Sequence, residues 1–231
     1  MNKKNLLLLH GALGCKKQFE SLKELLANEF NIYDLNFEGH GGRLSDKEFS
    51  IDLFAKNTLE YIQEIGLERT NIFGYSMGGY VALKLASENS DFIERIITLG
   101  TKFNWNKEVA EKEIRMLDPI KVEEKVPSFA KQLENLHYPC DWKEIMNKTS
   151  RMMIDLGNGN KLSDDNLKQI SIPTLIGVGE LDNMVTVEES KNVSDLLQNA
   201  KLRILEGFKH PLELIPMDKL AKLILDFTTK D

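Results

Sequence analysis

A chain of 231 residues, of which 42% are hydrophobic and 29% charged, fits one globular domain with room for an insertion. Its net charge of −6 disfavours nucleic acid as a partner, because phosphate binding needs clustered Lys and Arg, and the basic pairs here, such as Lys3-Lys4, are isolated. No stretch approaches the roughly 20 apolar residues that span a bilayer, and Leu6–Leu9 is too short for a secretory signal. These features predict a cytoplasmic protein that does not bind membranes.

Short apolar segments of strand length alternate with longer segments of helical periodicity along most of the chain. Six segments are predicted as strands: Leu6–His10, Phe30–Asn36, Thr70–Tyr75, Ile93–Leu99, Thr174–Val178 and Lys201–Leu205. Five segments are predicted as helices: Lys16–Glu29, Ile51–Ile65, Met77–Asn89, Val187–Gln198 and Leu212–Phe227. Strands that alternate with helices pair in parallel and carry helices on both faces. We therefore predict a doubly wound α/β fold with a mainly parallel six-stranded sheet, whose functional residues follow the carboxyl ends of the strands.

The alternation is interrupted between residues 102 and 169, where no strand-like run occurs and apolar residues recur at helical spacing. Such a segment is too long for a bare connection, so we predict inserted helices. We expect both ends of the segment to leave the carboxyl edge, so that residues 102–169 form a lid over a core of residues 1–101 and 170–231. An insertion that packs only against itself is the alternative. If the segment forms a lid, its large apolar side chains are expected to line a substrate pocket. These side chains are Trp105, Met116, Trp142, Met146, Met152 and Met153.

The clearest motif is Gly74-Tyr75-Ser76-Met77-Gly78, with the spacing G-x-S-x-G, between a predicted strand and a predicted helix. A strand that turns directly into a helix holds the residue at the turn in a strained conformation, with its side chain projecting outward. Gly74 and Gly78 remove the Cβ atoms that would collide at such a turn. The motif therefore predicts Ser76 as a nucleophile, and an ordinary glycine-rich turn is the alternative.

A serine hydroxyl becomes nucleophilic when a nearby base takes its proton. His210 is the predicted base, because it follows every candidate acid and lies in the loop after the last strand. His137 also follows the serine but lies among the inserted helices, where we expect a polar surface group. The acid that orients the base should follow the fifth strand. Asp182 is preferred there, because the turn needs a few residues before a side chain can face the histidine, and Glu180 is the alternative.

Acyl transfer also needs N–H donors for the oxygen that becomes negatively charged. The backbone N–H of Met77, at the start of the helix after the nucleophile, is one predicted donor. The loop after the first strand should supply the second, for which we predict the N–H of Ala12, with that of Leu13 as the alternative. Leu13 is also expected to line the pocket, beside the tryptophans of the insertion. His10, at the end of the first strand, is expected to be structural.

Together these motifs resemble the α/β-hydrolase superfamily across nearly the whole chain, and small single-domain serine esterases with a helical lid are the most similar members. The residues that carry the resemblance are His10-Gly11, Gly39-His40-Gly41, Gly74-Tyr75-Ser76-Met77-Gly78-Gly79, Gly179-Glu180-Leu181-Asp182 and His210. The resemblance implies a structural role for His40. The predicted function is hydrolysis of a carboxylic ester with a small, apolar acyl group, through an acyl-enzyme on Ser76.

The same three side chains can also cleave thioesters, lactones or C–C bonds, or transfer an acyl group. A CoA thioesterase would favour basic residues at the pocket mouth, for which the candidates are Lys102, Lys107 and Lys209. A receptor that binds a ligand with negligible turnover is the alternative from another class. The expected partner is a small-molecule ester or thioester, without a metal or an organic cofactor. Cys15 and Cys140 have no metal-binding or disulfide spacing, which predicts reduced thiols.

Overall fold

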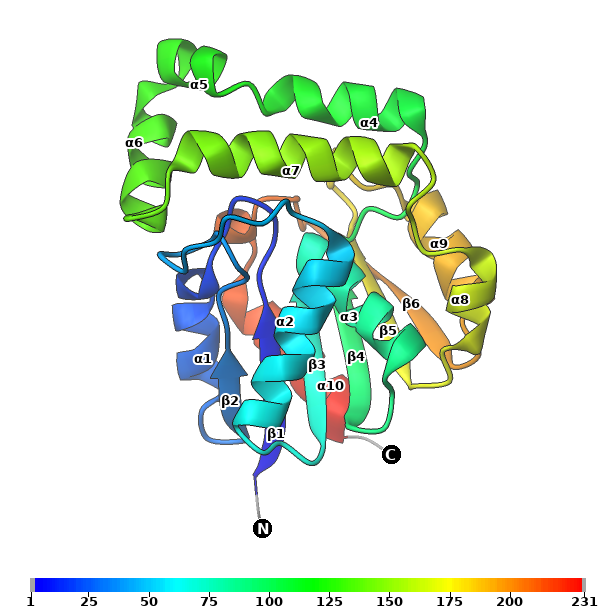
Figure 1. Ribbon diagram of the computed structural model, residues 1–231. Coiled ribbons are helices and arrows are strands. Elements are labelled where there is room, and N and C mark those ends of the chain that lie inside the picture. The colour runs from blue at the N-terminus through cyan, green and yellow to red at the C-terminus, as the bar shows by residue number, and fades with distance from the viewer. Residues whose placement is uncertain (1–2, 230–231) are drawn as a thin grey trace.

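The computed structural model describes residues 3–229 and contains a six-stranded sheet between two layers of helices (Figure 1). The strands are β1 Lys4–Leu9, β2 Phe30–Asp34, β3 Thr70–Tyr75, β4 Ile93–Leu99, β5 Thr174–Gly179 and β6 Ala200–Leu205. Their order is β2-β1-β3-β4-β5-β6, and every pairing in this sheet is parallel. The predicted doubly wound fold is confirmed.

The helices that flank the sheet are α1 Glu20–Leu26, α2 Ile51–Glu64, α3 Met77–Glu88, α9 Val187–Leu196 and α10 Met217–Thr229, and short 3₁₀ turns cover Lys16–Phe19 and Leu212–Leu214. The predicted helix from Leu212 to Phe227 is therefore interrupted. Pro216 causes the interruption, because its ring disfavours helical backbone at the preceding residue, and Ile215 is extended with φ −87° and ψ 132°.

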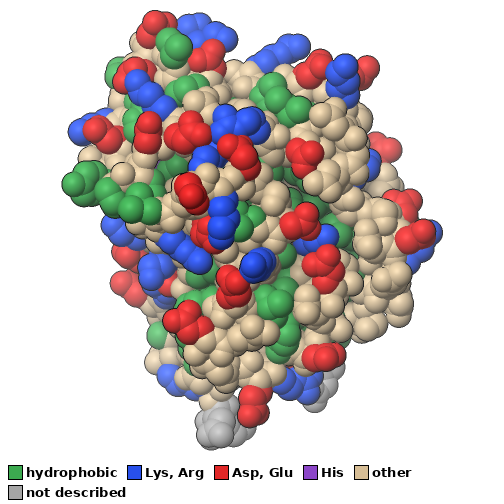
Figure 2. All heavy atoms as spheres, in the orientation of Figure 1, with side chains coloured by type: hydrophobic (Ala, Val, Ile, Leu, Met, Phe, Trp, Pro, Cys, Tyr) green, Lys and Arg blue, Asp and Glu red, His purple; other side chains and the backbone are tan. Residues whose placement is uncertain are grey.

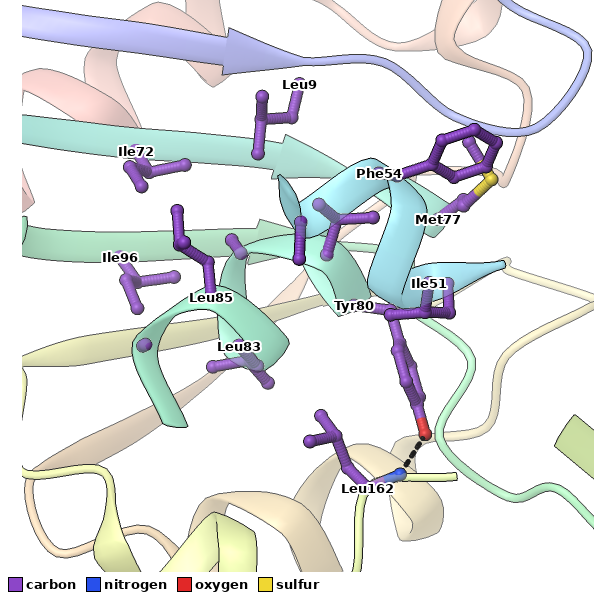
Figure 3. Close-up of a cluster of buried hydrophobic side chains, with 14 of the residues drawn as sticks. Leu9, Ile51, Phe54, Ile72, Met77, Tyr80, Leu83, Leu85, Ile96 and Leu162 are labelled. Carbon is purple, nitrogen blue, oxygen red and sulfur yellow. Dashed lines mark hydrogen bonds between the residues drawn. The ribbon is translucent and has the colours of Figure 1, made fainter. Parts of the chain in front are cut away.

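Alternate residues of each central strand face opposite layers of helices, as the pleat of a strand requires. Leu7 and Ile72 belong to a buried cluster with side chains of α2, α3 and α9, whereas Leu8 and Phe73 belong to a second cluster with α1 and α10. Figure 3 shows the first cluster, in which strand side chains such as Leu9 face helix α3. Burying each large apolar side chain contributes about 1.5–3 kcal/mol, so both layers are held firmly on the sheet.

The chain reverses its direction of travel across the sheet at β1. It passes from β1 to β2 on one side and then returns to β3 on the other side. The loops that follow β1 and β3 therefore leave neighbouring strands at the same edge, and ligands of doubly wound proteins bind at such a switch point. Residues 10–14 and Ser76 lie in these two loops.

The segment between β4 and β5 contains α4 Lys107–Glu113, a 3₁₀ turn Ile114–Met116, α5 Pro119–Lys125, α6 Pro127–His137, α7 Trp142–Gly157 and α8 Asp164–Gln169. Helices α4–α7, which we call the cap helices, lie across the carboxyl edge of the sheet (Figure 1). Helix α8 instead packs against α3 and α9, because the chain must return to the amino end of β5. The expectation that both ends of the segment leave the carboxyl edge is therefore wrong for its second end.

The division of the chain into a core and a lid stays a prediction. Residues 1, 2, 230 and 231, which belong to the predicted core, lie outside the described part of the chain. Within residues 3–229, no helix has both the length and the apolar character needed to cross a membrane. Figure 2 shows acidic and basic side chains interspersed over one face of the molecule.

Candidate active site

Ser76 occupies the single residue between β3 and α3, with φ 51° and ψ −118°. Positive φ is rare for residues with a side chain and marks local strain. The flanking glycines permit this turn, because a Cβ atom on Gly74 would collide with the backbone at the start of α3, and one on Gly78 with the carbonyl of Leu9. The Ser76 N–H donates to the carbonyl of Leu99 at 2.8 Å, which anchors the turn to β4.

His210 lies in the loop after β6 and faces the serine. The Ser76 hydroxyl donates to His210 Nε2 at 3.3 Å, which requires an unprotonated Nε2 and places the ring proton on Nδ1. The loop is held in place from β3, because the Tyr75 hydroxyl donates to the His210 carbonyl at 2.7 Å. His210 is 9% exposed, so the ring is largely buried.

Asp182 lies beyond β5 and pairs with the other side of the ring, where His210 Nδ1–H donates to Asp182 Oδ2 at 2.9 Å. Its Oδ1 accepts the N–H groups of Met184 at 2.8 Å and Val185 at 2.9 Å. Burial alone would raise the pKa of Asp182, but His210 and these N–H groups outweigh it and hold the pKa below its ordinary value. Gly100 passes beside this pair, and a Cβ there would lie 3.2 Å from Asp182 Oδ2.

Glu180, the alternative acid, points elsewhere. Its side chain is exposed, and its Oε2 accepts the N–H of Gly207 at 3.1 Å. The geometry therefore brings together Ser76, His210 and Asp182 and leaves Glu180 outside.

A small cavity of about 50 Å³ lies above Ser76 and is lined mostly by apolar side chains. Its lining consists of Ala12, Ile51, Ser76, Met77, Tyr80, Lys102, Trp105, Glu113, Met152, Met153, Leu156, Met184, Val185 and His210. Ala12 and Met77, whose N–H groups are the predicted donors, both line this cavity, and neither N–H donates a hydrogen bond to another group in residues 3–229. They are therefore available to an oxygen of a bound molecule. 

The model of the alpha/beta hydrolase fold family matches residues 4–136. The chain belongs to this family. Monoacylglycerol lipase abhd6-B of Xenopus laevis is 24% identical over 259 residues, which cover 98% of this chain and 75% of that protein. Two solved structures with the same fold are an esterase (EaEST) from Exiguobacterium antarcticum, with a TM-score of 0.81, and the enol-lactonase from Burkholderia xenovorans LB400, with 0.78. The esterase is 19% identical and covers 99% of this chain and 93% of its own; the lactonase is 18% identical, with 100% and 93%.

Not every predicted pocket residue of this α/β hydrolase reaches the cavity. Trp105 lines it, but Leu13 and Trp142 are not among its lining residues. Trp142 and Met146 pack in a separate cluster with α6. The reason is distance along α7, where the ten residues from Trp142 to Met152 correspond to about 15 Å of helix. Helical spacing identified the apolar face, but not which end of it lies over Ser76.

The other predicted lid residues divide in the same way. Met152 and Met153 line the cavity, whereas Met116 is 76% exposed. Met116 belongs to the short 3₁₀ turn between α4 and α5, and such a turn lacks the regular apolar face of a longer helix.

The prediction for His137 is wrong. This residue ends α6 and is completely buried. Its Nδ1 accepts the N–H of Gly41 at 3.0 Å, and its Nε2 lies 3.0 Å from the carbonyl oxygen of Leu13. A histidine at the polar end of a helix looks like a surface group in the sequence, because sequence spacing does not show that the hydrolase core packs against that end.

His10 and His40 are also completely buried in this α/β hydrolase. Burial lowers the pKa of His10 to about 4 and that of His40 well below its ordinary value, so both rings are neutral at neutral pH. His10 Nδ1 lies 2.8 Å from the carbonyl oxygen of Gly11, and its Nε2 accepts the N–H of Phe37 at 3.2 Å. Neither ring contacts Ser76 through a hydrogen bond among the described residues.

Six residues of the lining were not singled out from the sequence, namely Ile51, Tyr80, Glu113, Leu156, Met184 and Val185. A signal for Tyr80 was present, because residues four apart on a helix share a face, and Tyr80 follows Ser76 by four. Leu156 likewise follows Met152 by four on α7. Ile51 has no such spacing to the motif, since it enters the cavity from the start of α2.

Proposed function

We propose that this protein is a serine esterase that cleaves carboxylic esters with a small, apolar acyl group. In this proposal Ser76 is the nucleophile, His210 the general base and Asp182 the group that orients the base. The observation that carries the proposal is the hydrogen-bond chain from Ser76 Oγ to His210 Nε2 and from His210 Nδ1 to Asp182 Oδ2, at 3.3 and 2.9 Å.

The first step acylates the serine. Ser76 Oγ attacks the carbonyl carbon while His210 Nε2 takes the hydroxyl proton, and the carbonyl electron pair moves onto the oxygen. The N–H groups of Ala12 and Met77 bind that oxyanion, and each such donor contributes about 3–4 kcal/mol to transition-state stability. When the tetrahedral intermediate collapses, the bond to the alkoxy oxygen breaks, and the imidazolium of His210 protonates the leaving alcohol. Asp182 stabilises the imidazolium without taking its proton.

The second step releases the acid. His210 Nε2 takes a proton from water as the water oxygen attacks the acyl-serine ester, and the same N–H groups bind the new oxyanion. Collapse of this intermediate breaks the bond to Ser76 Oγ, which regains its proton from His210. The products are a carboxylic acid and the unchanged enzyme, so every proton and electron pair is accounted for.

The cavity supports the choice of substrate. Its volume of about 50 Å³ is far below the roughly 300–1,000 Å³ of typical ligand pockets, which favours a short acyl group. The names of the relatives, a lipase, an esterase and a lactonase, also refer to enzymes of ester bonds.

The state of Lys102 favours an ester over a CoA thioester. Its ammonium group donates to the Met184 carbonyl at 2.7 Å and lies 3.4 Å from a carboxylate oxygen of Glu113. A lysine at the cavity that is already paired with a carboxylate offers little attraction to the phosphates of CoA.

The decisive experiment combines a variant with an active-site probe. Ser76→Ala should lower the turnover of p-nitrophenyl acetate by about 10⁴-fold or more, because it removes the nucleophile, and should abolish labelling by a fluorophosphonate. Ser87→Ala, at the other end of α3, is the matched control and should keep both activities. Undiminished turnover in Ser76→Ala would refute the assignment.

A substrate series then defines the bond and the chain length. Esters from acetate to dodecanoate should show highest kcat/KM for the shorter acyl groups, with CoA thioesters assayed alongside. Faster cleavage of the thioesters would replace the proposed bond class. Tight ligand binding without turnover would instead favour a receptor.

A further inference from the structure

His137 connects the cap helices to the loop that carries the second proposed oxyanion donor. It ends α6, in the segment inserted between β4 and β5, whereas its hydrogen-bond partners Gly41 and Leu13 belong to loops after β2 and β1. Because the ring is completely buried, these contacts are shielded from water, and a hydrogen bond in such an environment is stronger than one on the surface.

The two contacts determine which nitrogen of His137 carries the proton. A backbone N–H can only donate, so Nδ1 must accept from Gly41 and cannot be protonated. The proton of the neutral ring is therefore on Nε2, which donates it to the carbonyl of Leu13 at 3.0 Å. Burial lowers the pKa of His137, which keeps the ring neutral and preserves this tautomer at neutral pH.

The hydrogen bonds continue from Leu13 through the loop to Ala12. The peptide group that contains the Leu13 carbonyl also contains the Gly14 N–H, which donates to the Gly11 carbonyl at 3.2 Å. The Gly11 carbonyl in turn shares a planar trans peptide group with the Ala12 N–H, since the cis bond found in the described chain is Tyr138-Pro139. Fixing the Gly11 carbonyl therefore fixes the direction of the Ala12 N–H, which points away from that carbonyl.

Two further observations show that this loop needs support. Leu13 has φ 56°, a left-handed conformation that a residue with a side chain keeps only when its surroundings enforce it. The Gly11 carbonyl also accepts a second hydrogen bond, from His10 Nδ1 at 2.8 Å. The loop is thus held at Gly11 from the core and at Leu13 from the cap, on both sides of Ala12.

We propose that His137 is a positioning residue for the oxyanion loop, and that it sets the direction of the Ala12 N–H through the hydrogen bonds of Leu13 and Gly14. This inference rests on the proposed function, because it assigns the Ala12 N–H to the oxyanion. A cap that docks through His137 therefore contributes to the acyl-transfer machinery as well as to the wall of the cavity.

Two amide variants of different length test the two hydrogen bonds of the His137 ring separately. In His137→Gln the side-chain amide nitrogen reaches the position of Nε2 and can still donate to Leu13. In His137→Asn the shorter amide reaches only the position of Nδ1 and loses Leu13. Active sites are first titrated to completion with a fluorophosphonate, so that kcat for p-nitrophenyl acetate is expressed per competent serine and a loss of folded protein does not count.

We expect His137→Asn to lower kcat per titrated site by about tenfold or more, below the roughly 10²–10³-fold that complete removal of one donor causes. KM should stay within about twofold, because the contact acts in the transition state. His137→Gln should keep kcat within about threefold of the wild type. Arg151→Gln is the matched control, since it removes a contact between the cap and Glu48 without touching the loop, and its kcat should not change.

Equal kcat values for the Gln and Asn variants would overturn the role of His137, provided that the wild type is active. A wild type without ester turnover or labelling would instead refute the proposed function. If His137→Asn does not fold, nitrogen NMR of the wild-type histidines still tests the inference. A ring protonated on Nδ1 of His137 would overturn it, and protonation on Nε2 alone supports it.

Discussion

Two groups of buried polar side chains in this molecule differ in the hydrogen-bond partners of their polar atoms. At the sheet edge, Ser76, His210 and Asp182 face one another, so a proton can pass between side chains. Below the cap, the ring nitrogens of His10 and His137 have only backbone hydrogen-bond partners among the described residues. Backbone N–H and carbonyl groups do not ionise near neutral pH, so the second group keeps its geometry and its neutral rings there.

The comparison explains why residue type alone does not identify a catalytic histidine. The ring of His210 has a carboxylate on one nitrogen and a hydroxyl on the other. The ring of His137 has a carbonyl and an N–H in the same two places. A carboxylate can stabilise the imidazolium that forms during acyl transfer, whereas a backbone N–H directed at the ring prevents that nitrogen from taking a proton. In the proposed function, the hydrogen-bond partners of each ring therefore decide whether the histidine takes part in the reaction or only supports a loop.

Removing the ring of His210 is expected to have the largest effect. His210→Ala should lower kcat for short esters by about 10⁴-fold or more, because the serine loses its base and the leaving alcohol its acid. The loss is measured as ester turnover, with thermal unfolding to show that the variant is folded. Glu206→Gln, an exposed position in the preceding turn, is the control and should keep full activity. Residual activity near that of the wild type would place the base elsewhere.

The buried rings predict a loss of stability in acid. The pKa of His10 is about 4 in the folded protein and about 6.5 in an unfolded chain. As the pH falls below 6.5, the unfolded chain takes up a proton that the folded protein does not, so stability is full above pH 6.5 and declines toward pH 4. At 1.36 kcal/mol per pKa unit, His10 alone accounts for about 3 kcal/mol. His40 and His137 act in the same direction.

Urea unfolding between pH 7 and pH 5 isolates this effect, because the pKa values of Asp182 and Glu38 lie below their ordinary acidic range and these carboxylates affect stability only at lower pH. His40→Gln removes one of the buried titrating rings and should make the decline shallower. A free energy of unfolding that is constant across this interval would mean that the buried rings accept protons freely, and would remove the distinction between the two groups.

The sheet and the residues at its edge could be predicted because both depend on local sequence. The bounds of β3 and β4 are as predicted, since both strands contain apolar pairs, Ile72-Phe73 and Ile96-Ile97, whose side chains are buried on opposite faces of the sheet. Ser76 was recognisable because the turn after β3 imposes its own requirement for glycine at fixed spacing. The order of the candidate acids and histidines along the chain then selected Asp182 and His210, because each follows the carboxyl end of a strand.

The cap residues could not be placed in the same way. Helical periodicity indicates which residues share a face, but the part of the core that a face meets depends on how the helices pack together. Trp142 and Met152 both lie on buried parts of α7, yet only Met152 reaches the cavity. His137 shows the same limit for a polar residue, because its partners Gly41 and Leu13 are about a hundred residues away in the sequence.

Substitution of Tyr80 is expected to have the smallest effect on activity. Its buried phenol adds a third kind of side chain to the comparison between the two groups of buried polar residues. Burial raises its pKa to about 12, and its hydroxyl accepts the N–H of Leu162 at 2.9 Å (Figure 3), so it belongs with the neutral, supporting groups. Tyr80 also lines both the cavity above Ser76 and a hollow of about 350 Å³ beside α8 and α9. The phenol should therefore limit the length of the acyl group.

Tyr80→Ala should join the two spaces and raise the ratio of kcat/KM for octanoate to that for acetate by about tenfold, within the range that a few methylene contacts contribute to specificity. Tyr80→Phe is the matched control. It removes the hydrogen bond to Leu162 but keeps the ring as a wall, so the ratio should stay within about twofold. If Tyr80→Phe changed the ratio as much as Tyr80→Ala, the position of Leu162 rather than the volume of the ring would set the chain length, and this buried hydroxyl would act on specificity through the backbone that it holds.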